Sequence, residues 1–182
     1  FVGDSNIEQY YPRVEVLINA SPSSVGTAIF KTGGGCLPVT GLKYDDSHAH
    51  CRDMMRDVVA LANGKPEIDR VVIGAQWNGY LTSGFGLAQP IQLGDATYDR
   101  ALESLSGFIK EMVSSGKKVY LVTNIPIGKE VDPKYIARRD VLSFPHVFML
   151  RSGGISKSDL DKKYGKIRSD LKRIGLESGA VL

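Results

Sequence analysis

The chain has 182 residues, of which 42% are hydrophobic, and a formal net charge of +3 from 23 basic and 20 acidic side chains. This length and composition predict a single globular domain over residues 1–182 with a sizeable core. The near balance of charge argues against a nucleic-acid partner, and no stretch approaches the roughly 18 apolar residues of a membrane span. The sequence begins inside a predicted strand without a signal-peptide pattern. We therefore expect a domain that is truncated at both ends.

Short β-branched apolar runs alternate with longer segments of helical periodicity along the chain. The predicted strands are one that ends at Val2, then 28–31, 70–75 and 118–124. The predicted helices are 6–18, 47–63, 98–115, 133–142 and 157–178. Pro12 is expected at the start or at a kink of a helix, because its ring disrupts a helix interior. The last four residues, 179–182, predict the start of a further strand.

Strands that read as continuous hydrophobic runs between helices indicate a parallel sheet covered on both faces. Right-handed crossovers then predict an α/β fold, a three-layer α/β/α sandwich with a central parallel sheet. In such open sheets the functional site lies at the carboxyl ends of the strands. A serine, several glycines and an asparagine follow these strand ends, in the segments 3–5, 32–36, 76–80 and 124–126.

Gly3-Asp4-Ser5 follows the first predicted strand and precedes a helix. A serine at such a turn exposes its Oγ beside the N–H groups of a helix, which suits an acyl-transfer nucleophile. The alternative interpretation is an ordinary turn, because Asp and Ser are common helix N-caps.

Acyl transfer also needs a base and hydrogen-bond donors for a tetrahedral oxyanion. The candidate donors are the backbone N–H of Ser5, a glycine N–H of segment 33–35 and the side-chain amide of Asn78. A flexible turn is the alternative for the glycines, and a turn-forming side chain is the alternative for Asn78. A phosphate-binding loop is excluded because no Gly-Lys-Ser/Thr follows the glycines.

Two aromatic residues, Trp77 and Tyr80, flank Asn78. Their rings are candidates for stacking on a sugar, whose C–H faces suit aromatic side chains, and a core role is the alternative for Trp77. The segment 82–93, which is rich in Gly and polar residues, is a candidate lining of the same groove.

The two cysteines, Cys36 and Cys51, either close a short loop as a disulfide or remain as free core thiols. Metal binding is disfavoured, because His48, His50 and Cys51 would need further ligands and no CxxC pair is present. We predict no metal site.

The motifs after the first three strands resemble the first three blocks of the SGNH (GDSL-like) hydrolases. The resemblance extends over essentially the whole chain to the SGNH domain that is fused behind a membrane acyltransferase-3 (AT3) domain in bacteria. Four segments carry it most specifically: 1–13, 32–38, 72–80 and 119–126. It implies that Ser5 is the nucleophile, that Gly34 and Asn78 are oxyanion donors, and that Cys36 and Cys51 form a disulfide.

The resemblance also implies the function. The domain would lie in the periplasm as part of a bacterial inner-membrane protein, and would move an acetyl or other acyl group onto a surface glycan such as lipopolysaccharide O-antigen. The domain itself would bind no cofactor, and acyl-CoA would be the ultimate donor through the membrane domain. Two alternatives remain: an SGNH esterase that hydrolyses acyl esters of carbohydrates, and a non-catalytic glycan-binding module.

The chain departs from the family pattern in two places. Asn6 stands where histidine often follows the serine, and the family's carboxyl-terminal Asp-x-x-His block does not occur at the end of this chain. Asp45-Asp46-Ser47-His48 has the same spacing, but its position between the cysteines at a helix start predicts a helix cap. His50 and His146 have no acidic partner at the right spacing. We therefore expect the catalytic His and Asp to lie outside these residues, and the isolated 182 residues to be nearly inactive.

Overall fold

A computed structural model describes residues 1–21, 26–123, 137–139, 147–149 and 156–182. The chain divides into two compact units, one of Phe1–Asn124 with Ile167–Leu182 and the other of Ile125–Lys166. The first unit contains a parallel sheet with its helices and the predicted site segments up to Tyr80. The second contains β5 (Ala137–Arg139), which pairs antiparallel with β6 (Val147–Met149).

The first unit is built on four parallel strands in the order β2-β1-β3-β4. Their bounds are β1 Val2–Gly3, β2 Lys31–Thr32, β3 Arg70–Gly74 and β4 Lys118–Val122. Val181 forms a parallel bridge with Tyr120 of β4, so the strand predicted at 179–182 begins beside β4. The predicted parallel sheet is confirmed, although the second strand lies slightly later than the predicted 28–31.

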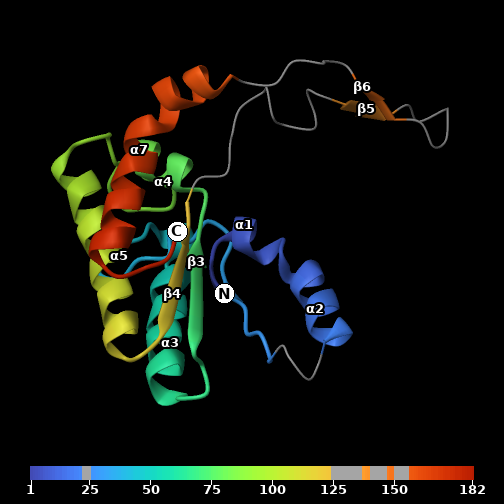
Figure 1. The fold of residues 1–182 in the computed structure, drawn as a ribbon. Helices are drawn as coiled ribbons and strands as arrows, with labels where there is room; N and C mark the ends of the chain where they lie inside the picture. The colour runs from blue at the N-terminus through green and yellow to red at the C-terminus, as the bar shows by residue number, and fades with distance from the viewer. Residues whose placement is uncertain (22–25, 124–136, 140–146, 150–155) are drawn as a thin grey trace. The chain divides into compact units, whose positions relative to one another are not determined.

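Helices cover both faces of this sheet (Figure 1). On one face lie α3 (His50–Gly64), α5 (Ala96–Ser114) and the part of α7 (Lys157–Glu177) that belongs to the first unit, from Ile167 onward, and on the other lie α1 (Ser5–Glu8) and α2 (Tyr11–Ala20). The arrangement confirms the predicted α/β/α architecture.

The two faces of the sheet are unequally buried. Val71, Ile73 and Val119 point into a continuous core that α3, α5 and the end of α7 complete. Val72 and Tyr120 alternate with them toward the other face and are only half-buried. The helix α2 on that other face has no buried residue. Most of the apolar stabilisation therefore comes from the α3–α5–α7 side.

The predicted helix 6–18 is two helices, α1 and α2, separated at Gln9 and Tyr10. Pro12 lies in the first turn of α2, as predicted, where its missing N–H leaves no internal helix bond unmade. The predicted helix 133–142 is wrong where the structure describes it, because Ala137–Arg139 is the strand β5. The rest of that range lies outside the described residues.

Two further helical segments were not predicted as separate elements. The short helix α4 (Trp77–Ser83) follows β3, and a single 3₁₀ turn, η1 (Asp46–His48), precedes α3. Helix α4 brings Asn78 and Tyr80 onto one turn, so it decides where the residues after β3 lie.

Glycines let α1 lie directly against the sheet. A Cβ on Gly3 would lie 1.9 Å from the carbonyl oxygen of Gly74, and a Cβ on Gly74 would lie 2.5 Å from the Cδ1 of Ile7. Ile7 of α1 is 1% exposed and packs over both glycines. The two glycines therefore fix how closely the turn that carries Ser5 approaches β3.

Candidate active site

Ser5 is the first residue of α1, directly after β1 and the capping residue Asp4. Its side chain is exposed, and its hydroxyl makes no hydrogen bond with any described residue. It borders an open depression of about 630 Å³ whose other walls include Tyr11, Phe30 and Thr32. The hydroxyl is therefore free and accessible at the carboxyl end of a strand.

The carboxylate of Asp4 joins the Ser5 turn to the segment after β3. Asp4 is 2% exposed, and its Oδ1 accepts from the backbone N–H of Asn6 at 2.8 Å. Its Oδ2 accepts from the backbone N–H of Gln76 at 3.0 Å and from the hydroxyl of Tyr80 at 3.1 Å. The side-chain amide of Asn6 also donates to both oxygens. One buried carboxylate thus fixes both the start of α1 and the start of α4.

The glycine loop after β2 is held against the same turn. The N–H of Gly33 donates to the carbonyl of Gly3 at 3.1 Å. The next residue, Gly34, is exposed, and no atom lies within 4 Å of the position that a Cβ would occupy. Gly34 therefore has open space on the side where a side chain would lie.

Asn78 lies in the first turn of α4, two residues after Gln76, and is 2% exposed. Its Oδ1 is buried without a hydrogen-bond partner, and its side chain makes no hydrogen bond within the described residues. Leaving a buried polar atom unpaired costs about 1–3 kcal/mol, so native cores rarely retain one without a reason. The Nδ2–H₂ group of this amide, which also makes no hydrogen bond within the described residues, is the candidate donor to an oxyanion.

The structure therefore links three segments that are far apart in sequence: the Ser5 turn, the glycine loop and the start of α4. The backbone N–H groups of Ser5 and Gly34 have no acceptor within the described part of the chain. Together with the Asn78 amide they are the candidate donors for an oxyanion.

The structure corrects the prediction that Trp77 and Tyr80 stack on a sugar. Trp77 is 1% exposed and donates its Nε1–H to the carbonyl of Val122 at 2.8 Å, and Tyr80 is 3% exposed. A stacking platform needs an open ring face, so we assign both rings to the core. Burial and the nearby Asp4 carboxylate raise the pKa of Tyr80, which therefore remains a neutral donor to Asp4.

Cys36 and Cys51 form the predicted disulfide, which links the glycine loop to the first turn of α3. Their sulfur atoms lie close to the His50 ring, with 3.4 Å from the Sγ of Cys36 to Nε2. This group has the composition of a metal site, but the paired sulfurs are not thiolates and so are poor ligands.

The Asp45 and His48 side chains pair with each other. Asp45 accepts from the backbone N–H of His48 at 2.9 Å, which confirms the predicted helix cap, and its Oδ1 also lies 2.8 Å from the Nδ1 of His48. The hydrogen bond with His48 holds the pKa of Asp45 below its usual value. Neither His48 nor His50 hydrogen-bonds Ser5. His146 lies outside the described residues.

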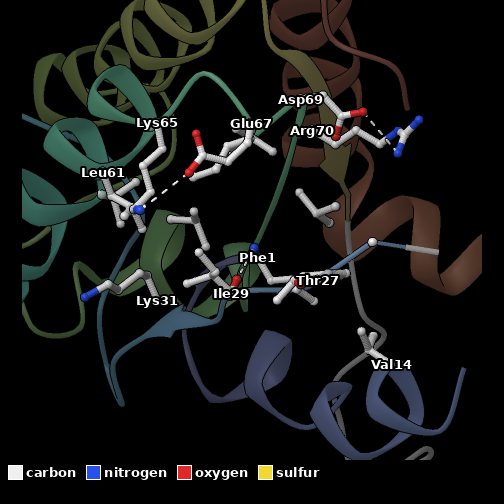
Figure 2. Close-up of a pocket in the computed structure, with 18 of the residues that line it drawn as sticks. Phe1, Val14, Thr27, Ile29, Lys31, Leu61, Lys65, Glu67, Asp69 and Arg70 are labelled. Carbon is white, nitrogen blue, oxygen red and sulfur yellow. Dashed lines mark hydrogen bonds and ion pairs between the residues drawn. The ribbon is translucent and has the colours of Figure 1, made fainter. Parts of the chain in front are cut away.

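A second pocket, larger than the depression beside Ser5, lies at the other end of the sheet. It has a volume of about 800 Å³ and is lined by the beginnings of β1, β2 and β3 together with apolar residues of α2 and α3 (Figure 2). Phe1, Ile29 and Leu61 point toward it. None of the residues predicted to act in acyl transfer lines it.

Sequence reasoning missed the wider role of Asp4, which it treated as a helix cap. A cap accepts from its own helix, whereas Asp4 also accepts from Gln76 and Tyr80, more than 70 residues away. A local pattern carries no signal for such long-range bonds. The short, glycine-containing helix α4 was missed for a related reason, since its seven residues show too little periodicity.

An α/β sandwich with an exposed serine after its first strand and candidate donors from two neighbouring loops is typical of hydrolase-like proteins that transfer acyl groups. A family model described as the SGNH domain fused to AT3 domains matches residues 1–182. The chain belongs to this family. Comparisons with curated proteins and with solved structures gave no significant match. Among the described helices, none combines the length and the apolar character of a membrane span.

Proposed function

We propose that this chain is the serine-dependent O-acyltransferase domain of an AT3–SGNH protein, and that it moves an acetyl or other acyl group onto a bacterial surface glycan. The observation that carries the proposal is the Asp4 carboxylate, which ties the turn of the exposed Ser5 to the helix of the unpartnered Asn78. Family membership supports the same reading.

In the proposed reaction the Oγ of Ser5 attacks the acyl carbonyl and gives its proton to a base. The carbonyl oxygen becomes an oxyanion that the N–H groups of Ser5 and Gly34 and the amide of Asn78 stabilise. Loss of the donor's leaving group, which takes up the proton, leaves an acyl-serine. A sugar hydroxyl then attacks this ester, loses its proton to the base, and releases Ser5, which is reprotonated.

The base is proposed to be the family's Asp-x-x-His pair, outside these residues. The free hydroxyl of Ser5 agrees with this, because no described side chain accepts a hydrogen bond from it. We further propose a periplasmic location, acyl-CoA as the ultimate donor through the AT3 domain, and no cofactor bound by this domain.

The free hydroxyl also keeps a second candidate function open, that of a non-catalytic glycan-binding module. An esterase would use the same acyl-serine and transfer the acyl group to water. Product analysis with and without a glycan acceptor separates transferase from esterase, and the absence of any acyl-serine would favour the binding module.

The test uses the full AT3–SGNH protein and an activated acetyl ester. Ser5→Ala is expected to lower turnover by about 10⁴-fold or more, because the covalent step is lost. The matched control is Ser114→Ala, an exposed serine at the end of α5, which is expected to leave turnover unchanged. Equal turnover in Ser5→Ala and Ser114→Ala would show that Ser5 is not the nucleophile.

A further inference from the structure

One aromatic ring near the glycine loop is open to solvent. Phe85 follows α4 and is 56% exposed, in contrast to the buried Trp77 and Tyr80. Its ring meets the His48 ring edge-on, with 5.2 Å between centroids, and lies 6.1 Å from the Tyr80 ring. Single exposed aromatic rings are ordinary on protein surfaces, but this ring has a specific set of polar and glycine neighbours.

His48 is held in one orientation beside this ring. Its Nδ1 lies 2.8 Å from the Oδ1 of Asp45, so Nδ1 carries a proton and donates it to the carboxylate. In the neutral ring the lone pair is then on Nε2. Nε2 makes no hydrogen bond with any described residue and is not enclosed by them. The molecule thus presents an oriented, unused hydrogen-bond acceptor.

Two glycines leave room for the imidazole. Gly35 and Gly86 both have a φ of +75°, a conformation that favours glycine. A Cβ on Gly35 would lie 2.6 Å from the Nε2 of His48, and a Cβ on Gly86 would lie 3.2 Å from its Cγ. The backbone of both loops therefore packs directly on the ring. The N–H of Asp45 also donates to the carbonyl of Gly86 at 3.1 Å, which links the turn that carries His48 to the Gly86 loop.

This cluster is connected to the Ser5 turn by short contacts. Phe85 packs against Tyr80, and the Tyr80 hydroxyl donates to Asp4, the residue before Ser5. On the other side, the His48 ring touches Gly35, the residue after the proposed oxyanion donor Gly34. Both sets of contacts place Phe85 and His48 at the carboxyl end of the sheet.

We propose that Phe85, His48 and Asp45 form a binding subsite for the acceptor sugar. The open face of Phe85 takes the C–H face of a pyranose ring, and the Nε2 of His48 accepts a hydrogen bond from one of its hydroxyls. Asp45 is a positioning residue that acts through His48. The inference rests on the proposed function for the nature of the acceptor and assigns the contacts that bind it.

The chemistry of the site favours a neutral, hydroxyl-rich ligand. The cluster offers one apolar ring face and one hydrogen-bond acceptor, and the Asp45 charge is already engaged by two hydrogen bonds from His48. A phosphate or a carboxylate would find no lysine or arginine among these three residues. A flat apolar ligand would leave Nε2 unsatisfied, whereas a sugar satisfies both groups.

The test measures saccharide binding in the absence of any acyl donor, so its outcome does not depend on Ser5. The probes are methyl glycosides of glucose, galactose, mannose and N-acetylglucosamine, titrated into the full AT3–SGNH protein and followed by saturation-transfer NMR. At least one probe is expected to bind, and Phe85→Ala is expected to weaken it about tenfold. Phe85→Tyr, which keeps the ring, is expected to bind as the unaltered protein does.

His48→Leu is expected to weaken the same probe about fivefold, and His48→Gln, which can still accept a hydrogen bond, to weaken it less. The control is Leu176→Ala, an equally exposed apolar residue on α7, which is expected to change nothing. Because Phe85 is exposed, its replacement leaves the core intact. No binding by any probe, or equal binding in Phe85→Ala and Leu176→Ala, would overturn the subsite while leaving the Ser5 assignment to its own test.

Discussion

The two ends of the parallel sheet differ in pocket volume and in polar residues: the end with the larger pocket is not the end that carries the candidate site residues. The beginnings of the strands border the larger pocket, about 800 Å³ with mostly apolar walls. The strand ends border a shallower depression of about 630 Å³, but they carry Ser5, the buried Asp4 and the unpartnered Asn78. The larger pocket is therefore not the one that borders these polar residues.

The strand ends that carry Ser5 and Asn78, called the Ser5 end below, are distinguished by the hydrogen bonding of their polar atoms. Asp4 is saturated with hydrogen bonds and holds two loops together, whereas the Ser5 hydroxyl and the Asn78 amide have no partners within the described residues. In a preorganised site, a fully hydrogen-bonded residue such as Asp4 holds in place groups that have no hydrogen-bond partner, such as the Ser5 hydroxyl and the Asn78 amide. Substitutions at each end of the sheet test this difference.

After Ser5→Ala, the largest effect is expected from Asn78→Ala, which removes a proposed oxyanion donor. Acyl transfer by the full protein should fall about 10²–10³-fold. The free energy of unfolding should change by less than about 1 kcal/mol, because the side chain has no hydrogen bond to lose. Steady-state rates with an activated ester check the first outcome and urea unfolding checks the second. The control is Asn19→Ala on exposed α2. A stability loss without a rate loss would make Asn78 a structural residue.

The disulfide links the glycine loop to α3, so its removal should destabilise the Ser5 end of the sheet. The double variant Cys36→Ala, Cys51→Ala is expected to lower the free energy of unfolding by about 3 kcal/mol, as the chain-entropy model gives for a loop of this length. Urea unfolding followed by the fluorescence of Trp77, the single tryptophan, measures it. A loss below about 1 kcal/mol would show that the loop is held by its other contacts.

Asp4→Asn tests whether the Asp4 carboxylate holds the Ser5 turn and the start of α4 together. The amide replaces one carboxylate oxygen with an N–H₂ group that cannot accept from Gln76 or Asn6, so the free energy of unfolding should fall by about 2 kcal/mol. The rate should fall as well, because Ser5 and Asn78 lose their common anchor. Asp53→Asn is the control, since its ion pair with Arg56 is exposed and contributes little. An equal effect of both substitutions would contradict the anchoring role.

The smallest effect is expected at the other end of the sheet. Leu17→Ala removes an exposed side chain that lines the large pocket and should change acyl transfer by less than about twofold. A tenfold loss in the same ester assay would mean that this pocket takes part in the reaction, and the contrast between the two ends would fail.

The sequence predicted the parts of this molecule that depend on local pattern. The hydrophobic runs of β3 and β4 and the periodicity of α3 and α5 are strong because these elements bury one face in the core. The strand-end rule then placed Ser5, Gly34 and Asn78 at one rim. The burial of Trp77 and Tyr80 and the bonds from Asp4 to Gln76 and Tyr80 depend on tertiary packing, which local pattern does not encode.

The exposed Phe85 was missed for the same reason, because nothing in the local sequence separates a surface ring from a core ring. The position of β5 was missed as well. Its three residues, Ala137–Arg139, are stabilised by pairing with β6 rather than by their own propensity.

The central claim is that the Ser5 hydroxyl carries the acyl group, and mass spectrometry of a trapped intermediate tests it most directly. The full AT3–SGNH protein is mixed with an activated acetyl ester, quenched in acid and digested. The account predicts one added acetyl group on the peptide that contains Ser5, and none on that peptide in Ser5→Ala. Turnover with no acetyl on that peptide, or with the acetyl on another residue, would contradict it.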